Sequence, residues 1–156
     1  MGKTLVAYFS RKGHTKRLAE QIHSMLEGSD LFEIKTVKSY PKNYFATVFA
    51  VRREMKAGKE LTLSTHIKDM DSYDRIIIGY PIWFGTIPMA LSAFFKEYDF
   101  SGKTVAPFAT YGGSGIEKSE ADVKTNLPQS RVLKGFGYGG FSKGNVDTWI
   151  KDVLNG

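Results

Sequence analysis

The chain has 156 residues, of which 42% are hydrophobic and 13% aromatic, and this composition predicts one folded domain spanning residues 1–156. It contains no cysteine, which excludes disulfides, thiolate metal sites and cysteine nucleophiles. The formal net charge is +6, but the basic residues are spread along the chain, so nucleic acid is not the expected partner. No apolar run is long enough for a membrane span, and the first residues lack the layout of a signal peptide. We therefore expect a cytoplasmic protein without a membrane partner.

The first half of the chain alternates between strand and helix patterns. A short apolar run from Thr4 to Phe9 predicts a strand buried on both faces. Apolar residues at helical spacing follow and end at Gly28, a residue type common at helix C-termini. An alternating stretch over 31–37 predicts an edge strand, and another helical stretch runs from Pro41 to Gly58.

The second half continues the same alternation. Its strongest strand signal is Ile76 to Ile78, within YDRIIIGYP, and a helix is predicted from Met89 to Glu97. The next strand pattern runs from Lys103 to Thr110, although Pro107 weakens this prediction locally. The remaining predicted elements are a helix at 116–127, a strand at 131–136 and a helix at 144–154.

Five strands with helices between them predict an α/β fold: a three-layer, doubly wound, five-stranded parallel sheet covered on both faces. Ligands of such sheets bind beyond the carboxyl ends of the strands, where the strand order reverses. The turns after the first, third and fourth predicted strands are therefore the candidate binding site.

Several catalytic and nucleotide-binding motifs are excluded. The segment SGKT at 101–104 lacks the first glycine of a Walker A loop and precedes a strand. The segment GFGYGG at 135–140 matches a dinucleotide fingerprint, but it follows the last predicted strand. No G-x-S-x-G nucleophile elbow occurs, and the three histidines lack metal-ligand spacing. The residues therefore predict no catalytic group and no metal site.

The turn after the first strand combines the features of an anion site. Ser10, Gly13 and Thr15 lie between a strand end and a helix start, where unpaired amides converge and the helix dipole is positive. Arg11 and Lys12 add positive charge. The lack of further glycines suits one phosphate rather than a pyrophosphate. The alternative is that Thr15 caps the helix and its neighbours are solvated.

The other two turns carry aromatic side chains. The segment YPIWFGTIP, at 80–88, presents Trp83 and Phe84 on a turn stiffened by prolines, which suits stacking against a flat ligand. The alternative is that Trp83 packs in the core. The glycines of TYGGSG, at 110–115, allow close approach of the backbone to a ligand, and Tyr111 adds a ring. Together the three turns favour a ligand with one terminal phosphate and a broad aromatic ring.

These segments resemble the flavodoxin family. YFSRKGHTKRLAE is similar to the flavodoxin phosphate loop, and YPIWFGTIP and TYGGSG are similar to its two flavin-ring loops. The resemblance covers essentially the whole chain, is to the short-chain type, and implies the strand order 2-1-3-4-5 and non-covalently bound FMN. The implied phosphate-loop residues are Ser10, Arg11, Lys12, Gly13, His14 and Thr15. The implied ring-loop residues are Pro81, Ile82, Trp83, Phe84, Gly85, Thr110, Tyr111, Gly112 and Gly113, with Trp83 as the stacking candidate.

The resemblance implies an electron-transfer protein that shuttles one or two electrons between redox partner proteins, a reductase and an acceptor. The alternative is an enzyme, an FMN-dependent NAD(P)H oxidoreductase acting on quinones or similar acceptors, because carrier and enzyme share fold and cofactor. A nucleic-acid-binding domain ranks behind both. We expect a monomer, with a dimer as the alternative. Flavodoxins usually surround the ring with carboxylates, but these two ring loops contain no Asp or Glu, which predicts a less negative potential for the final reduction of the flavin.

Overall fold

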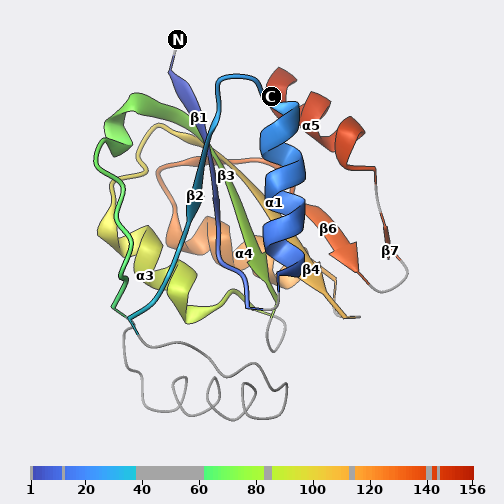
Figure 1. Cartoon of the computed structure of the whole chain (residues 1–156), viewed down its shortest axis with the longest axis horizontal. Helices are drawn as coiled ribbons and strands as arrows, with labels where there is room; N and C mark the ends of the chain where they lie inside the picture. Colours follow the sequence, from blue (N-terminus) through green and yellow to red (C-terminus); the bar gives the residue numbers. More distant parts are fainter. Residues whose placement is uncertain are drawn as a thin grey trace.

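The computed structural model shows strands and helices in alternation (Figure 1). It describes residues 2–11, 13–37, 62–82, 86–112, 115–139, 142–143 and 145–156. The strands are β1 (Lys3–Tyr8), β2 (Asp30–Glu33), β3 (Tyr73–Pro81), β4 (Thr104–Tyr111), β5 (Arg131–Val132), β6 (Phe136–Gly139) and β7 (Ser142–Lys143). The helices are α1 (His14–Met25), the short 3-10 helix η1 (Met70–Ser72), α3 (Met89–Glu97), α4 (Glu117–Asn126) and α5 (Val146–Asn155). The helix predicted from Pro41 to Gly58 lies outside the described residues.

The described strands form one sheet with the order β2-β1-β3-β4-β6-β7, and β5 also pairs with β4. The pairings among β1 to β6 are parallel, whereas β7 pairs antiparallel with β6. Because β5 and β6 follow one another along β4, they share the place of the fifth strand. The predicted doubly wound parallel sheet of order 2-1-3-4-5 is confirmed. The antiparallel β7 is an addition that the sequence pattern does not predict.

Pro107 explains why the fifth strand is divided. The amide of Leu133 donates to the Val105 carbonyl at 2.8 Å, so Val105 directs its backbone groups toward this neighbouring strand. Pro107, two residues further along β4, faces the same neighbour but has no amide hydrogen to donate. Gly135 lies against it, since a Cβ there would come within 2.9 Å of the Pro107 carbonyl oxygen. The prediction of one continuous strand over 131–136 is therefore wrong, while Pro107 itself lies within β4.

The central strands are buried under different helices on their two faces. Val6 and Ile77 belong to the hydrophobic cluster that contains residues of α1 and α5. Leu5, Ile76 and Ile78 belong to the cluster that contains residues of α3 and α4. Figure 1 shows α1 in front of the sheet and α4 behind it. Because both faces are covered, these strands are continuous apolar runs, and the predicted three layers are confirmed.

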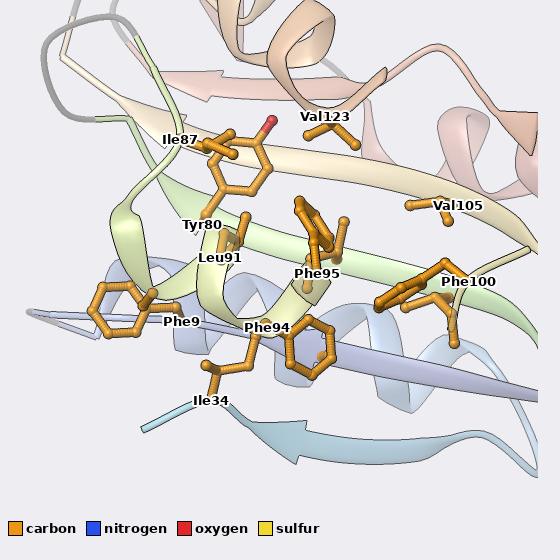
Figure 2. Close-up of a cluster of buried hydrophobic side chains, with 14 of the residues drawn as sticks. Phe9, Ile34, Tyr80, Ile87, Leu91, Phe94, Phe95, Phe100, Val105 and Val123 are labelled. Atoms are coloured by element: carbon orange, nitrogen blue, oxygen red, sulfur yellow. The ribbon is translucent and has the colours of Figure 1, made fainter. Parts of the chain in front are cut away.

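The cluster on the α3 and α4 face packs around Phe94 of α3. Its ring centroid lies 5.7 Å from that of Phe100, in an edge-on arrangement. Figure 2 shows Ile34 beside Phe94, and Tyr80 of β3 beside Ile87, which precedes α3. This packing fixes α3 on the sheet. It thereby also fixes the far end of the segment that leads from β3 into α3.

Candidate cofactor site

The phosphate-loop candidates lie where β1 leads into α1, at the edge of the sheet where β1, β3 and β4 end, here called the carboxyl edge. Gly13 immediately precedes α1 and has a φ of 96°, a left-handed conformation that favours glycine. Its amide donates to the Ser10 hydroxyl at 3.0 Å, which closes the turn. Ser10 and Arg11 are half-buried, His14 is exposed, and Lys12 lies outside the described residues. The turn therefore presents the start of α1 at the carboxyl edge.

The charges on the first turn of α1 suit an anion. The Arg17 amide donates to the Gly13 carbonyl at 3.0 Å, which marks the first helical hydrogen bond. The amides before Arg17 have no acceptor within the helix, and the dipole makes this end positive. The first turn nevertheless holds no acidic residue and instead carries exposed Lys16 and Arg17. Such a turn repels cations and is stabilised by a bound anion.

Thr15 connects this loop to the end of β4. Its hydroxyl lies 2.8 Å from the hydroxyl of Thr110, and the two residues are 1% and 8% exposed. One hydroxyl donates to the other, so one of the two protons stays available to another acceptor. The residue before α1 is Gly13, and no side chain caps the helix. The alternative of Thr15 as an ordinary N-cap is therefore wrong.

The flavin-ring candidates after β3 are described only at the two ends of their turn. Pro81 and Ile82 are half-buried, and the Ile82 amide donates to the Thr110 carbonyl at 2.9 Å. This bond joins the turn after β3 to the end of β4. Trp83, Phe84 and Gly85 lie outside the described residues, so their contact with the flavin ring and the alternative of Trp83 in the core both stay predictions.

Tyr111, at the end of β4, packs against β6. A Cβ at Gly137 would lie 2.8 Å from Cε1 of the Tyr111 ring, so only glycine leaves room for this ring. Gly112 is exposed and Gly113 lies outside the described residues. Two glycines of the GFGYGG segment, Gly135 and Gly137, thus serve close packing on β4. For these two glycines, the packing explains the residue type without a bound dinucleotide.

Helix α4 contributes two side chains that the sequence analysis missed. The Tyr80 hydroxyl donates to the Ser119 hydroxyl at 3.1 Å, and the Thr86 hydroxyl donates to the Asp122 carboxylate. Burial raises the pKa of Tyr80 well above its usual range, so this phenol stays a proton donor. The available signal was the three-residue spacing of Ser119 and Asp122, which places both on one face of a helix. Nothing in the sequence indicated which strand that face meets.

Two of the three histidines, His23 and His66, have ordinary polar partners. His66 Nδ1 lies 2.8 Å from the Glu97 carboxylate, and His23 Nδ1 lies 2.8 Å from the Ser29 hydroxyl. Within the described residues, no three His, Asp or Glu side chains gather as metal ligands would. No helix in the described part of the chain has the length and apolar character that crossing a membrane requires.

The start of α1, the buried hydroxyls of Thr15 and Thr110, and the first residue after β3 thus meet at the carboxyl edge of a doubly wound sheet. This arrangement defines the α/β proteins that bind a ligand at the switch point of the strand order. Residues 3–153 match the flavodoxin family, and the chain belongs to this family. Membership confirms the predicted flavodoxin-like class and FMN as its cofactor. The unpaired amides in the first turn of α1 and the hydroxyls of Thr15 and Thr110 are hydrogen-bond donors that fit the phosphate of FMN.

Solved structures resemble the whole chain. A crystal structure of a candidate flavoprotein from Bacteroides uniformis is 36% identical, with a TM-score of 0.84, and the match covers 96% of this chain and 98% of that one. A flavoprotein from Lactobacillus acidophilus, solved in complex with FMN, has a TM-score of 0.78 at 23% identity and 99% coverage of both chains. The second likeness supports the fold alone.

Curated relatives have the name NAD(P)H dehydrogenase (quinone). The protein from Cupriavidus metallidurans is 33% identical over 98 residues, which are 62% of this chain and 47% of that protein. The protein from Methylocella silvestris is 28% identical over 159 residues, covering 94% of this chain and 77% of that protein. The chain thus spans about half the length of the first of these relatives.

Proposed function

We propose that this protein holds FMN non-covalently at the carboxyl edge and carries one or two electrons between redox partner proteins, without a substrate of its own. The observation that carries the proposal is the start of α1. There, Gly13 at a φ of 96° precedes a first turn free of acidic residues, and Thr15 is buried beside it.

On the phosphate side, the side chains of Ser10 and Thr15 and the first amides of α1 would hold the phosphate. Hydrogen bonds to a charged group contribute about 1.5–3 kcal/mol each, so a few of them give a strong preference for a phosphorylated ligand. Arg11, Lys12 and His14 would surround it with further donors. The buried Thr15–Thr110 pair keeps the loop in place before the ligand arrives.

On the ring side, Pro81 to Gly85 and Thr110 to Gly113 would frame the flavin, with Trp83 stacked on it. FMN supplies the electron transfer, and the chain supplies position, exclusion of water and local charge. The Ile82–Thr110 backbone hydrogen bond holds the two ring turns together. The protein itself therefore needs no catalytic side chain.

The partners we propose present acidic surfaces. The formal charge of +6 exceeds what one phosphate neutralises, and exposed Lys16 and Arg17 lie beside the proposed phosphate site. Opposite charges steer encounter and raise association rates, most strongly at low ionic strength. We place the protein in the cytoplasm as a monomer. The association rate with an acidic partner should therefore fall as salt is added.

A second function has one observation in its favour. The relatives from C. metallidurans and M. silvestris are named NAD(P)H dehydrogenase (quinone), which supports an FMN-dependent NAD(P)H oxidoreductase acting on quinones. Because a carrier and an enzyme of this kind have the same fold and cofactor, the site itself does not distinguish them.

Anaerobic mixing with NADH or NADPH separates the two functions. A pure carrier has no nicotinamide site, so in that case the flavin absorbance stays that of the oxidised form until a reductase is added. Dithionite is the control, since it reduces the flavin of either kind of protein. Rapid bleaching by NADH or NADPH alone, followed by turnover with a quinone, contradicts the carrier and supports the oxidoreductase.

A further inference from the structure

Four polar side chains cross the sheet at its amino edge, where β1, β3 and β4 begin, opposite the candidate cofactor site. The strand register pairs Thr4 with Arg75, Arg75 with Thr104, and Thr104 with Arg131. Register partners in neighbouring parallel strands have their side chains on the same face of the sheet. Two hydroxyls and two guanidiniums therefore alternate along one row, here called the amino-edge row.

The amino-edge row lies on the face of the sheet that α1 and α5 cover. Ile77, two residues after Arg75 in β3, belongs to the hydrophobic cluster that contains residues of these two helices. Both helices end at the amino edge (Figure 1). Thr4, Arg75 and Thr104 are half-buried, and Arg131 is exposed. The row is therefore partly covered by the protein and reaches solvent at Arg131.

Arg75 carries a buried donor without an acceptor. Its Nε is buried and has no hydrogen-bond partner among the described residues. A buried donor that lacks an acceptor costs free energy, and folded proteins retain few of them. The guanidinium also keeps its positive charge throughout the pH range in which proteins fold. An anionic acceptor beside Arg75 satisfies both the donor and the charge.

The described carboxylates do not supply this acceptor. Asp74, next to Arg75 in sequence, accepts from the Gly2 amide at 2.7 Å. Neither arginine of the row forms an ion pair within the described part of the chain, which includes Glu27 and Asp152 near the ends of α1 and α5. The C-terminal ends of these helices contribute about half a negative charge each. The two guanidiniums exceed that sum by about one charge, so the row attracts an anion.

We propose that the amino-edge row binds a phosphate group, held by the guanidiniums of Arg75 and Arg131 and by the Thr104 hydroxyl between them. Strands lie about 4.8 Å apart, so the two arginines are about 10 Å apart at their Cα atoms and their long side chains can reach one group above Thr104. A carboxylate occupies one guanidinium fork. A phosphate has three terminal oxygens and up to about two negative charges, so two guanidiniums and a hydroxyl can share it. The site is separate from the proposed FMN site and does not rest on the proposed function.

The test follows the Arg75 Nε–H resonance by NMR while inorganic phosphate is added at constant ionic strength. The resonance is assigned by its loss in Arg75→Lys. Phosphate is expected to shift it saturably, whereas chloride at the same ionic strength leaves it in place. This readout is local to the amino edge, so phosphate bound at the start of α1 does not contribute to it. The result is therefore independent of FMN binding.

Variants of the other two residues test the shared phosphate. Arg131→Gln and Thr104→Val are each expected to weaken phosphate binding at least about tenfold, since each removes a hydrogen bond to a charged group. Lys3→Gln is the matched control. Lys3 is also exposed at the amino edge, but it precedes Thr4 in β1 and so points to the opposite face of the sheet. Its loss removes the same charge and leaves the phosphate affinity unchanged.

Two further ligands define the chemistry. Glycerol 3-phosphate that binds more tightly than inorganic phosphate identifies the ligand as the phosphate of an organic molecule, and weaker binding identifies it as free phosphate. Acetate that shifts the resonance at the same concentrations as phosphate overturns the assignment to phosphate. The proposal is also overturned by the lack of a saturable shift, or by unchanged phosphate affinity in Arg131→Gln. Because Arg131 is exposed, this variant keeps the fold and decides alone if Thr104→Val does not fold.

Discussion

The hydroxyl groups of Thr15 and Thr110 lie 2.8 Å apart in the protein interior, although the two residues are 95 positions apart in sequence. Thr15 belongs to the first turn of α1, and Thr110 is near the end of β4. The same Thr110 accepts a hydrogen bond at its carbonyl from the Ile82 amide. Thr110 thus connects the start of α1 to Ile82, the first residue after β3.

Replacing either threonine is expected to leave its partner hydroxyl buried without a hydrogen bond. Thr15→Val and Thr110→Val should each lower the free energy of unfolding of the apoprotein by about 1–3 kcal/mol. The double variant should lose less than the sum, because it leaves no unpaired hydroxyl. Urea denaturation of the four proteins measures this cycle. Strictly additive losses contradict the pairing.

Gly13→Ala tests the left-handed start of α1. Because Gly13 has a φ of 96° and open space around its Cβ position, the cost is purely conformational, about 1–2 kcal/mol of stability. Gly112→Ala is the matched control, since Gly112 also has open space but is not among the glycines with positive φ. Thermal or urea unfolding of the two apoproteins should show a loss only for Gly13→Ala. Equal losses of stability in the two variants contradict the claim that the left-handed conformation at position 13 requires glycine.

Gly79→Ala tests the packing of the central strands. A Cβ at Gly79 would fall within the Phe108 ring, which covers this position of β3 from β4. Forcing the ring aside should cost about 1–3 kcal/mol of unfolding free energy. The Gly79→Ala/Phe108→Leu double variant should lose less unfolding free energy than the sum of the losses in the two single variants. Additivity in this pair indicates that the two residues do not compete for space.

Alkaline pH is expected to weaken the fold through two tyrosines. Burial, together with the Asp30 carboxylate that accepts from its hydroxyl at 2.6 Å, raises the pKa of Tyr73 to about 12. Burial and nearby Glu33 raise the pKa of Tyr8 to about 12. The folded state holds these protons more tightly than the unfolded chain, whose tyrosines titrate near 10. This stabilisation is complete below pH 10 and is lost as the pH rises toward 12.

Tyrosinate absorbance follows these two groups directly. In the folded protein, Tyr8 and Tyr73 should ionise about two pH units above the ordinary value and Tyr80 later still, and Tyr73→Phe should remove one of the first two steps. The free energy of unfolding of Tyr73→Phe should also fall less steeply between pH 10 and 12 than that of the wild type. A normal titration of all tyrosines contradicts the environments described for Tyr8 and Tyr73.

The basic chain makes a prediction about the potential of the flavin. With a net charge of +6 and no carboxylate in the sequence of either ring loop, the final reduction should occur at a less negative potential than in acidic flavodoxins. A redox titration of the purified holoprotein measures the difference. A potential as low as that of acidic family members contradicts the prediction.

Local sequence patterns predicted where helices and strands lie better than where a strand is interrupted. The predicted helix from Met89 to Glu97 coincides with α3, because its apolar spacing and the preceding Pro88 both define it. The break between β5 and β6 was not predicted, because it depends on Pro107 in a neighbouring strand rather than on residues 131–136. Pro107 weakened the prediction for its own strand, yet its effect falls on the next one.

The site divides in the same way. The turn from Ser10 to Thr15 was predictable because a glycine and two hydroxyls are close together between a strand and a helix. The contacts of Ser119 and Asp122 were not, because their partners Tyr80 and Thr86 lie 39 and 36 residues earlier in the chain and only the folded sheet brings them together. The partner of Thr15 was also unpredictable, because Thr110 is 95 residues away in sequence.

Calorimetric titration of the apoprotein with FMN and riboflavin tests the central claim, that the carboxyl edge holds FMN by its phosphate and its ring. We expect one FMN bound per chain, at least about a hundredfold tighter than riboflavin, because two or more charge-assisted hydrogen bonds depend on the phosphate. In Thr15→Val this preference should shrink through loss of FMN affinity alone. Equal affinity for FMN and riboflavin in the wild-type protein, or no binding of FMN, contradicts the account.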